Sequence, residues 1–492
     1  MMTSPINTHF ISEPYSMNSL SKTLALLAIL ILSSCVDPQS TTRDEGNDPQ
    51  DKTYVIKNVN IIPMTNANDV IENANVLIKD NFIYSINDSI PSNALTIDGT
   101  GKWLIPGLID MHVHTNADLN FRANKPTQGA TFFMNTQHVM TPHVANGVTT
   151  IFELSARVEH FGQRNEIAKG EVVGPRMALA RLINGGDGSG SVNTEADARQ
   201  AVRSAKNEGY NFIKVYSHLS IESYQAAIDE AQKHGLKVVG HIPDVFKGQT
   251  ENAFILHFGL VAHAEELSKQ IRNQPKTAKD AENFARMAKE NDTWLIPNLI
   301  AIVKIRDQVK SLDSIRSMES LKYVHPLLRD KWLNSNNYNK HSSSEFLGYL
   351  DSLIAFHQEI VVAFKEAGVP MVSGTDAGVS GVVTGFALHD ELQLLAEAGL
   401  TNEEVLISAT RHPAEWLGIA EMVGTVEEGK FADLVLLDAN PLDEISNTRR
   451  ISGVFVNGTW LDKQKIDALL KDLADWNTEN IDTYEWQKRR MY

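Results

Sequence analysis

The chain has 492 residues, of which 42% are apolar and 22% are charged, values that suit one large globular domain joined to a smaller one. The formal net charge of −16 disfavours nucleic acid as a partner. The single cysteine, Cys35, excludes intrachain disulfides, cysteine-rich metal sites and CxxC redox chemistry, so any metal ion must be held by histidine, carboxylate or modified side chains.

An apolar run of nine residues, LALLAILIL, occupies residues 24–32. A bilayer span takes about 20 apolar residues, so this run has the length of a signal-peptide core instead. The following LSSC, which ends at Cys35, resembles the cleavage box of bacterial lipoproteins. The resemblance implies a signal peptide at residues 1–34, an acylated Cys35 and a flexible tether at residues 35–52. We therefore expect a membrane lipoprotein of the cell envelope, at the outer membrane or on the periplasmic face; the alternative is a buried N-terminal helix.

Short strands are expected near both ends of the mature chain. Residues 74–78 and 82–86 flank Lys79-Asp80-Asn81, and Asp and Asn tolerate the left-handed backbone that a tight hairpin needs. Residues 424–461 have a similar strand-rich pattern. Two strand-rich ends thus enclose a long middle.

Eight apolar runs alternate with helical stretches in that middle. Continuous apolar strands separated by helices indicate a parallel sheet covered on its faces, and eight units indicate a closed (β/α)₈ barrel of the TIM type. One helix is expected from Ile221 to a stop at Gly235, and another begins with a capping box at Thr401 and Glu404. The runs are residues 108–109, 148–152, 177–180, 212–216, 236–239, 260–262, 293–296 and 369–373.

Residues 305–360 form a charged, helix-rich insertion after the seventh run. Long segments on the catalytic side of a barrel often act as lids. A peripheral helical layer is an equally simple interpretation.

Polar residues occur where the apolar runs end, and this is where such barrels place their functional side chains. Two histidines at positions i and i+2 follow the first run, so both can face inward and bind one metal ion. Charged residues are rarely buried without a partner, which favours a metal site over simple packing. The candidate set is His112, His114, Lys214, His241, His263 and Asp376.

Six motifs occur in order along the chain: PGLIDMHVH, FIKVY, GHIP, HAEEL, SGTDAG and GTVEEGKFADLVLLDANPL. Together they resemble the imidazolonepropionase-like branch of the amidohydrolases, which includes prolidase-type and other dipeptide-cleaving enzymes. The resemblance covers nearly all of residues 54–460 and implies a (β/α)₈ barrel at residues 106–421 and a small β-sandwich built from residues 53–105 and 422–465. A helical tail is expected at residues 466–492.

The resemblance also implies a binuclear metal centre, in which the donor set favours zinc. His112, His114 and Asp376 would hold one divalent ion, and His241 and His263 would hold a second. Lys214 would bridge the two as an N-carboxylated lysine. The chemistry is coherent, because burial lowers a lysine pKa and exposes the neutral amine to carbon dioxide. The resulting carbamate is an anionic oxygen ligand that suits zinc beside imidazoles.

The implied function is metal-dependent hydrolysis of an amide or dipeptide C–N bond by a metal-bridging hydroxide. Asp376 would act first as general base and then as general acid. Alternatives are hydrolysis of a cyclic amide and deamination with a single metal ion. A different class, a catalytically silent envelope binding protein, also stays open. In each case the partner is a small molecule, such as a short peptide.

Three further residues are candidates for substrate binding. Tyr216 lies two residues after Lys214 on the same strand face, where it can steady an oxyanion or a substrate carboxylate; a packed aromatic is the alternative. Arg181 follows the third run and can bind an anionic group. His143 can line the pocket. The sequence gives no role to Glu265 or Glu266.

Overall fold

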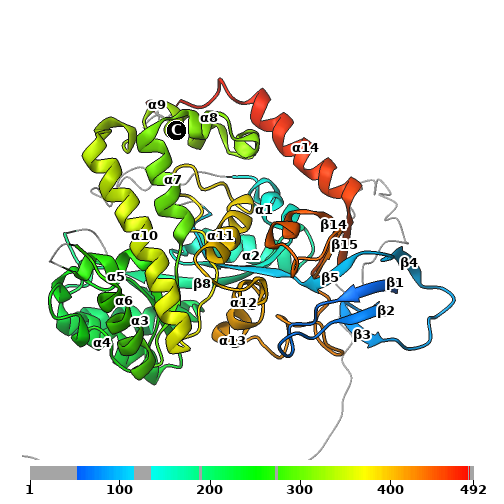
Figure 1. The fold of residues 1–492 in the computed structure, drawn as a ribbon, viewed down its shortest axis with the longest axis horizontal. Coiled ribbons are helices and arrows are strands. Elements are labelled where there is room, and N and C mark those ends of the chain that lie inside the picture. The colour runs from blue at the N-terminus through cyan, green and yellow to red at the C-terminus, as the bar shows by residue number, and fades with distance from the viewer. Residues whose placement is uncertain (1–52, 116–133, 188–190, 272–274, 486, 488–492) are drawn as a thin grey trace, which may run out of the picture. The chain divides into compact units, whose positions relative to one another are not determined.

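The structure is a computed structural model that describes residues 53–115, 134–187, 191–271, 275–485 and 487. The expected signal peptide, Cys35 and the tether lie outside these residues. Figure 1 shows the described chain as a barrel with covering helices and a sheet at one side.

The barrel sheet contains seven parallel strands whose order in space follows their order in the chain. Seven of the eight expected runs are thereby confirmed as strands. Inside the sheet, one apolar cluster includes Met111, Ala180 and Val239. The strands are β6 (Leu108–Val113), β7 (Val148–Glu153), β8 (Arg176–Ile183), β9 (Phe212–Val215), β10 (Lys237–Gly240), β11 (Phe258–Ala262) and β12 (Trp294–Ile296).

The eighth run, residues 369–373, is not a regular strand, although it lies where the eighth strand was expected. Val372 N donates to Leu295 O on β12 at 3.0 Å, and Met111 N on β6 donates to Ser373 O at 3.0 Å. The segment therefore closes the barrel between its first and last strands. The ladder stays short because Pro370 has no N–H to donate, and because Asp376 turns the chain with φ +58°.

Helices cover the barrel as the alternating pattern predicts. The capping box of Thr401 and Glu404 is confirmed, and Gly235 follows the expected helix with φ +65°. At the end of the barrel remote from the strand carboxyl termini, Trp416 packs its ring 5.6 Å from that of Phe212. The helices are α1 (Thr136–Ala145), α2 (Val158–Ala168), α3 (Glu195–Glu208), α4 (Ile221–Lys233), α5 (Ala264–Gln270), α6 (Ala278–Glu290), α11 (Phe386–Glu397), α12 (Asn402–Ser408) and α13 (Arg411–Leu417).

A second sheet combines strands from both ends of the chain, in the order β15-β14-β13-β5-β1-β2-β3, with β4 paired to β1. The expected hairpin turn is confirmed, since Asp80 and Asn81 have φ of +51° and +68°. The strands are β1 (Tyr54–Ile61), β2 (Ile71–Lys79), β3 (Phe82–Ile86), β4 (Leu95–Asp98), β5 (Trp103–Pro106), β13 (Leu434–Leu437), β14 (Ile451–Val456) and β15 (Thr459–Asp462).

The segment after β12 is helical, as expected, and a C-terminal helix lies near it on the same side of the barrel (Figure 1). α10 is long and apolar enough to cross a membrane by composition alone, but Phe356, Ile360 and Phe364 on it are buried in the main core. The elements are α7 (Leu299–Lys310), α8 (Asp313–Arg316), η6 (Glu319–Tyr323), α9 (Pro326–Asn334), η7 (Asn339–His341), α10 (Ser344–Ala367) and α14 (Lys463–Glu479).

Candidate metal centre

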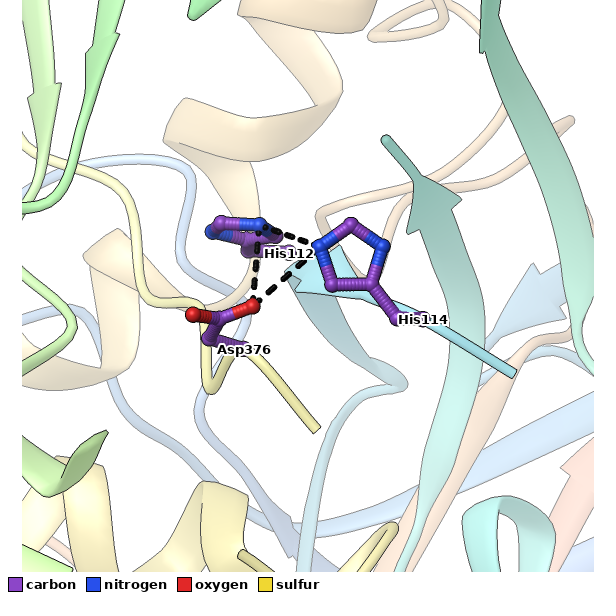
Figure 2. Close-up of side chains that lie close together, drawn as sticks. All are labelled: His112, His114 and Asp376. Atoms are coloured by element: carbon purple, nitrogen blue, oxygen red, sulfur yellow. Dashed lines mark hydrogen bonds and ion pairs between the residues drawn. The ribbon is translucent and has the colours of Figure 1, made fainter. Parts of the chain in front are cut away.

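Two histidines at the end of β6 meet an aspartate from the segment that closes the barrel (Figure 2). His112 Nε2 lies 3.1 Å from His114 Nε2, and each of these nitrogens lies 3.2 Å from Asp376 Oδ1. His112 is fully buried, whereas His114 and Asp376 keep a little exposure toward the open end of the barrel. These three donor atoms are close enough to hold one metal ion.

The local backbone explains why both histidines point inward. Ile109 and Met111 pack in the apolar interior, and the register of β6 against β7 then shifts between Asp110 and Val113. This shift places the side chains of His112 and His114 on the inner side of the barrel. The buried Asp110 carboxylate accepts from Thr375 N at 3.0 Å and from Thr375 Oγ1 at 2.7 Å. It thus fastens β6 to the residue before Asp376, and burial raises the pKa of Asp110 to about 7.

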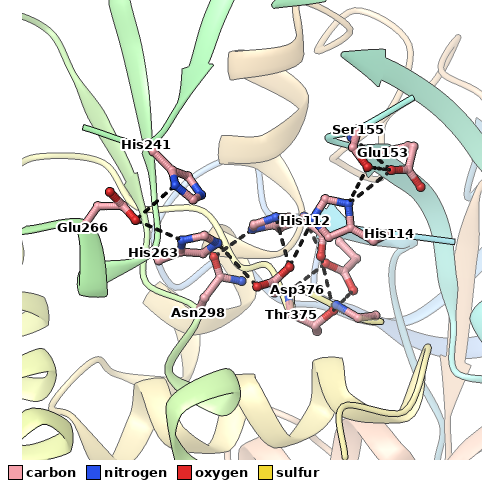
Figure 3. A network of polar contacts seen from close by, with 12 residues as sticks. His112, His114, Glu153, Ser155, His241, His263, Glu266, Asn298, Thr375 and Asp376 are labelled. Atoms are coloured by element: carbon pink, nitrogen blue, oxygen red, sulfur yellow. Dashed lines mark hydrogen bonds and ion pairs between the residues drawn. The ribbon is translucent and has the colours of Figure 1, made fainter. Parts of the chain in front are cut away.

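Outer side chains hold the far ring nitrogen of both histidines (Figure 3). His112 Nδ1 lies 3.1 Å from Asn298 Oδ1. His114 Nδ1 lies 3.1 Å from Ser155 Oγ and 3.3 Å from Glu153 Oε1. With Nδ1 engaged in this way, Nε2 of each ring is left to face Asp376. Such outer partners commonly orient metal-binding histidines.

A second group lies at the ends of β10 and β11. His241 Nδ1 lies 2.8 Å from Ser217 Oγ and 3.2 Å from Glu266 Oε1. His263 Nε2 lies 3.4 Å from Asp376 Oδ2, while its Nδ1 lies 4.0 Å from Glu266. The ring of His263 also stacks on that of His112, with centroids 4.8 Å apart. The two groups are therefore adjacent and meet at Asp376.

Lys214 on β9 is 1% exposed, and its Nζ has no hydrogen-bond partner among the described residues. Burial lowers the pKa of Lys214 to about 8. Its charge in turn contributes to lowering the pKa of His112 in the first group and of His241 in the second. The amine therefore lies near both groups.

The electrostatics of these residues fit bound cations. Burial lowers the pKa of His112 and His241 well below 6.5, so both rings are neutral and offer a lone pair. Burial alone would also lower the pKa of His114, but contacts with Asp376 and Glu153 raise it to about 9. The two carboxylates thus favour positive charge where the Nε2 atoms meet, and a divalent ion would supply it. Imidazole and carboxylate donors suit zinc and similar metals.

The three expected substrate-binding residues occupy different places. Tyr216 stacks on His241 with ring centroids 3.9 Å apart and lines a cavity at the second group. Arg181 is exposed on the outer face of β8, next to the inward Ala180, so the structure does not bring it to the centre. His143 is fully buried in α1 and lines none of the cavities described. This burial lowers the pKa of the His143 imidazole to about 4.

Three residues at the centre had no assigned role in the sequence, namely Glu153, Glu266 and Asn298. Glu153 follows the second run directly, so the rule that function lies at strand ends would have found it. Asn298 lies two residues after the seventh run, and its left-handed backbone brings its side chain to His112. Glu266 lies three residues after His263, in the first turn of α5. Helical spacing places it near that histidine.

Residues 103–461 match the Amidohydrolase family model, and the chain belongs to this family. It is similar to an imidazolonepropionase from Thermoplasma volcanium, with 24% identity over 80% of this chain and 91% of the relative. It is also similar to a dihydroorotase from Listeria monocytogenes, with 25% identity over 78% of this chain and 89% of the relative. Among solved structures, a Xaa-Pro dipeptidase with bound methionine has a TM-score of 0.63 at 20% identity, over 84% of this chain and all of the other. The predicted family and barrel are confirmed, and the chain is an enzyme that acts on carbon–nitrogen bonds.

Proposed function

We propose that this enzyme hydrolyses the amide bond of a small substrate, with dipeptides as the first candidates, in a centre that takes two divalent ions. One observation carries the proposal. Three imidazoles, those of His112, His114 and His263, turn Nε2 toward the two oxygens of Asp376. Outer groups occupy or face the other nitrogen of each ring. Such an arrangement binds metal rather than substrate alone.

Divalent ions held by these residues would supply Lewis-acid activation of water and of the scissile carbonyl. The protein supplies the proton transfers. Contacts with His112, His114 and His263 hold the pKa of Asp376 well below its ordinary value despite its burial, so its carboxylate is ionised. Asp376 then accepts a proton from the attacking water and delivers it to the leaving nitrogen. Tyr216, beside His241, is placed to orient the substrate.

Lys214 is proposed to be N-carboxylated. Its neutral amine attacks carbon dioxide, an N–C bond forms, and one proton is released to give a carbamate anion. The buried and unpartnered Nζ near both groups supports this modification. A carbamate would replace a buried positive charge with an anionic donor between the groups. Carbon-13 NMR after supply of labelled bicarbonate tests it, because Lys214→Met must remove the carbamate signal.

The activity test uses zinc-loaded protein that starts after Cys35, with a dipeptide library and detection of released amino acids. Asp376→Asn serves as the control. We expect release that disappears in the control. Cleavage that persists unchanged in Asp376→Asn, with metal still bound, would overturn the assigned role of this residue. Absence of release from every dipeptide would overturn the peptidase assignment.

A cyclic amide is the second candidate substrate. The similarity to relatives named imidazolonepropionase and dihydroorotase favours it, because both align over most of their length. The same centre serves either substrate, since both reactions break a C–N bond of an amide. A panel of cyclic imides and ureides, assayed for ring opening by loss of absorbance, separates the two candidates.

We also propose that Cys35 carries a lipid anchor that holds the enzyme in the cell envelope. The apolar run at residues 24–32 and the LSSC sequence support this location. Labelled palmitate fed to expressing cells is expected to appear in the wild-type protein and not in Cys35→Ala. Equal labelling of both proteins would contradict the assignment.

A further inference from the structure

A cavity lies on the His114 side of the candidate metal centre. His114, Thr115 and Gly378 contribute to its wall, so the cavity opens onto the groups that would act on the substrate. The remaining wall comes from Met134 and α1, from residues 323–332, from residues 382–384 and from α14. It is mainly apolar and aromatic, and includes Val139, Leu328, Trp332, Val383, Leu473 and Trp476.

No Lys, Arg, Asp or Glu occurs among the described residues that line this cavity. The cavity on the opposite side, at the second histidine group, contains Glu265, Lys269 and Asp376. Among the described residues, a substrate held across the centre therefore meets a wall without carboxylate, lysine or arginine side chains on the His114 side, and a wall that contains them on the other. Because burying an ion without a partner is costly, the His114 side suits an apolar group.

Helix α14 is fastened in place over this cavity. Its N-terminus is capped by Asp462, whose carboxylate accepts from Lys465 N at 2.9 Å. Near its other end, Asn477 Nδ2 donates to Lys322 O at 2.9 Å. The ring of Trp476 lies 5.1 Å from that of His138 on α1. The helix is thus tied to two neighbouring elements and forms a fixed wall.

Asn477 adds a polar feature to the same wall. It is 4% exposed, and its Oδ1 has no hydrogen-bond partner among the described residues. Its Nδ2 is engaged by a carbonyl, so the oxygen is the free acceptor. A buried acceptor without a partner is unfavourable, and a ligand with an N–H or O–H would satisfy it. An indole or a phenol has this combination of apolar surface and one donor.

We propose that this cavity is the specificity pocket of the enzyme for a large, uncharged, aromatic group of the substrate, with α14 as its selective wall. The proposal rests on the amide hydrolysis proposed above, because it assigns one side of that substrate. The opposite, charged cavity then receives the polar end of the same molecule.

The kinetic test uses two dipeptide series, X-Ala and Ala-X, with X as Gly, Leu, Phe and Trp. In one of the series kcat/KM is expected to rise about 10-fold or more from Gly to Trp, since a filled pocket discriminates by this order. Trp476→Ala should remove most of that rise. Leu469→Ala is the matched control, because Leu469 lies on α14 and packs against the main core without lining the cavity. A flat profile in both series, or equal loss in both variants, would overturn the proposal.

A binding test separates this pocket from the hydrolytic activity. Asp376→Asn protein is titrated calorimetrically with N-acetyl-L-tryptophanamide and with N-acetylglycinamide. The tryptophan probe is expected to bind about 10-fold or more tightly, and Trp476→Ala added to this variant should abolish the difference. If the wild type cleaves no peptide but the difference persists, the hydrolysis proposal fails and the pocket stands. If the two probes bind equally, the pocket is overturned.

Discussion

The two halves of the candidate metal centre, the His112 group and the His241 group, offer the same kinds of donor but differ in how complete they are. In the first half, His112, His114 and Asp376 bring three donor atoms within 3.1–3.2 Å of one another. In the second half, His241 and His263 have Glu266 as their third neighbour, and its carboxylate faces the Nδ1 side of both rings. The first half is therefore complete with unmodified side chains. On its inner side the second half shares Asp376 with the first, since Asp376 Oδ2 lies 3.4 Å from His263 Nε2, and the described residues give it no second carboxylate there. The proposed carboxylation of Lys214 would supply a further anionic donor.

The largest effect is expected at Asp376, because both halves meet at its carboxylate. Asp376→Asn should lower kcat about 1,000-fold, since the proton-transfer group is lost. It should also weaken metal binding, since a neutral amide is a poorer donor than a carboxylate. Steady-state kinetics on the best dipeptide and elemental analysis of the dialysed protein measure the two effects. An unchanged kcat would mean that Asp376 does not move the proton.

The second largest effect is expected at Lys214, and it distinguishes the two halves of the centre. Lys214→Met should reduce the metal content from about two ions per chain to about one, with a loss of activity of about 100-fold. The first half should retain its ion, because its three donors do not include Lys214. Lys237→Met is the control, since Lys237 is an exposed lysine on the neighbouring strand β10, and its Nζ contacts the Trp416 carbonyl at the other end of the barrel. Two ions in Lys214→Met would show that the second half is complete without the carbamate.

A smaller effect is expected from the outer partner of the second half. Glu266→Gln should weaken the second ion about 10-fold to 100-fold, because the carboxylate that orients His241 becomes neutral. Glu265→Gln is the matched control in the same helical turn, since Glu265 is far more exposed and contacts Lys269 without reaching either histidine. Competition with a chromophoric chelator measures the affinity. Equal effects of both substitutions would argue for a general charge effect.

The sequence predicted much of this centre because its residues follow regular local patterns. Each of the four histidines lies at the end of an apolar strand or shortly after it. Because such barrels place functional residues at the carboxyl ends of their strands, this position is sufficient to predict a shared site for His112, His114, His241 and His263. Arg181 shows where that rule fails. Residues alternate along β8, so Arg181 faces outward when its neighbour Ala180 faces inward. Counting the alternation of side chains from an inward Ala180 would have excluded Arg181 from the centre.

Other features depend on tertiary packing that the sequence pattern does not encode. Asn298 adopts a left-handed conformation with φ +51°, and only this turn brings its side chain to His112. The final helix was expected, but its sequence does not identify the element against which it packs. Only the structure shows that Trp476 reaches the cavity beside His114. Sequence reasoning therefore identified the candidate ligands but not the substrate-facing wall.

The smallest effect concerns His143, which is fully buried in α1. Burial lowers the pKa of His143 to about 4, below the unfolded value of about 6.5. Between these values the unfolded chain binds a proton that the folded chain does not, so this residue destabilises the fold as the pH falls below about 6.5. His143→Leu removes that contribution and also a ring whose nitrogens have no partner among the described residues.

Relative to the wild type, His143→Leu should therefore gain stability as the pH falls, by up to about 1.4 kcal/mol per pH unit below 6.5. Urea midpoints at pH 7 and pH 5 measure the difference. His218→Gln is the control, because His218 is exposed.

Near the second half, burial also lowers the pKa of His357, to about 3, but its Nε2 lies 3.2 Å from Ser268 Oγ. His357→Leu should show the same dependence on pH with a lower stability at pH 7, because it leaves Ser268 without this bond. Identical stability changes at pH 7 in the two variants would show that the contact of His357 with Ser268 adds no stability.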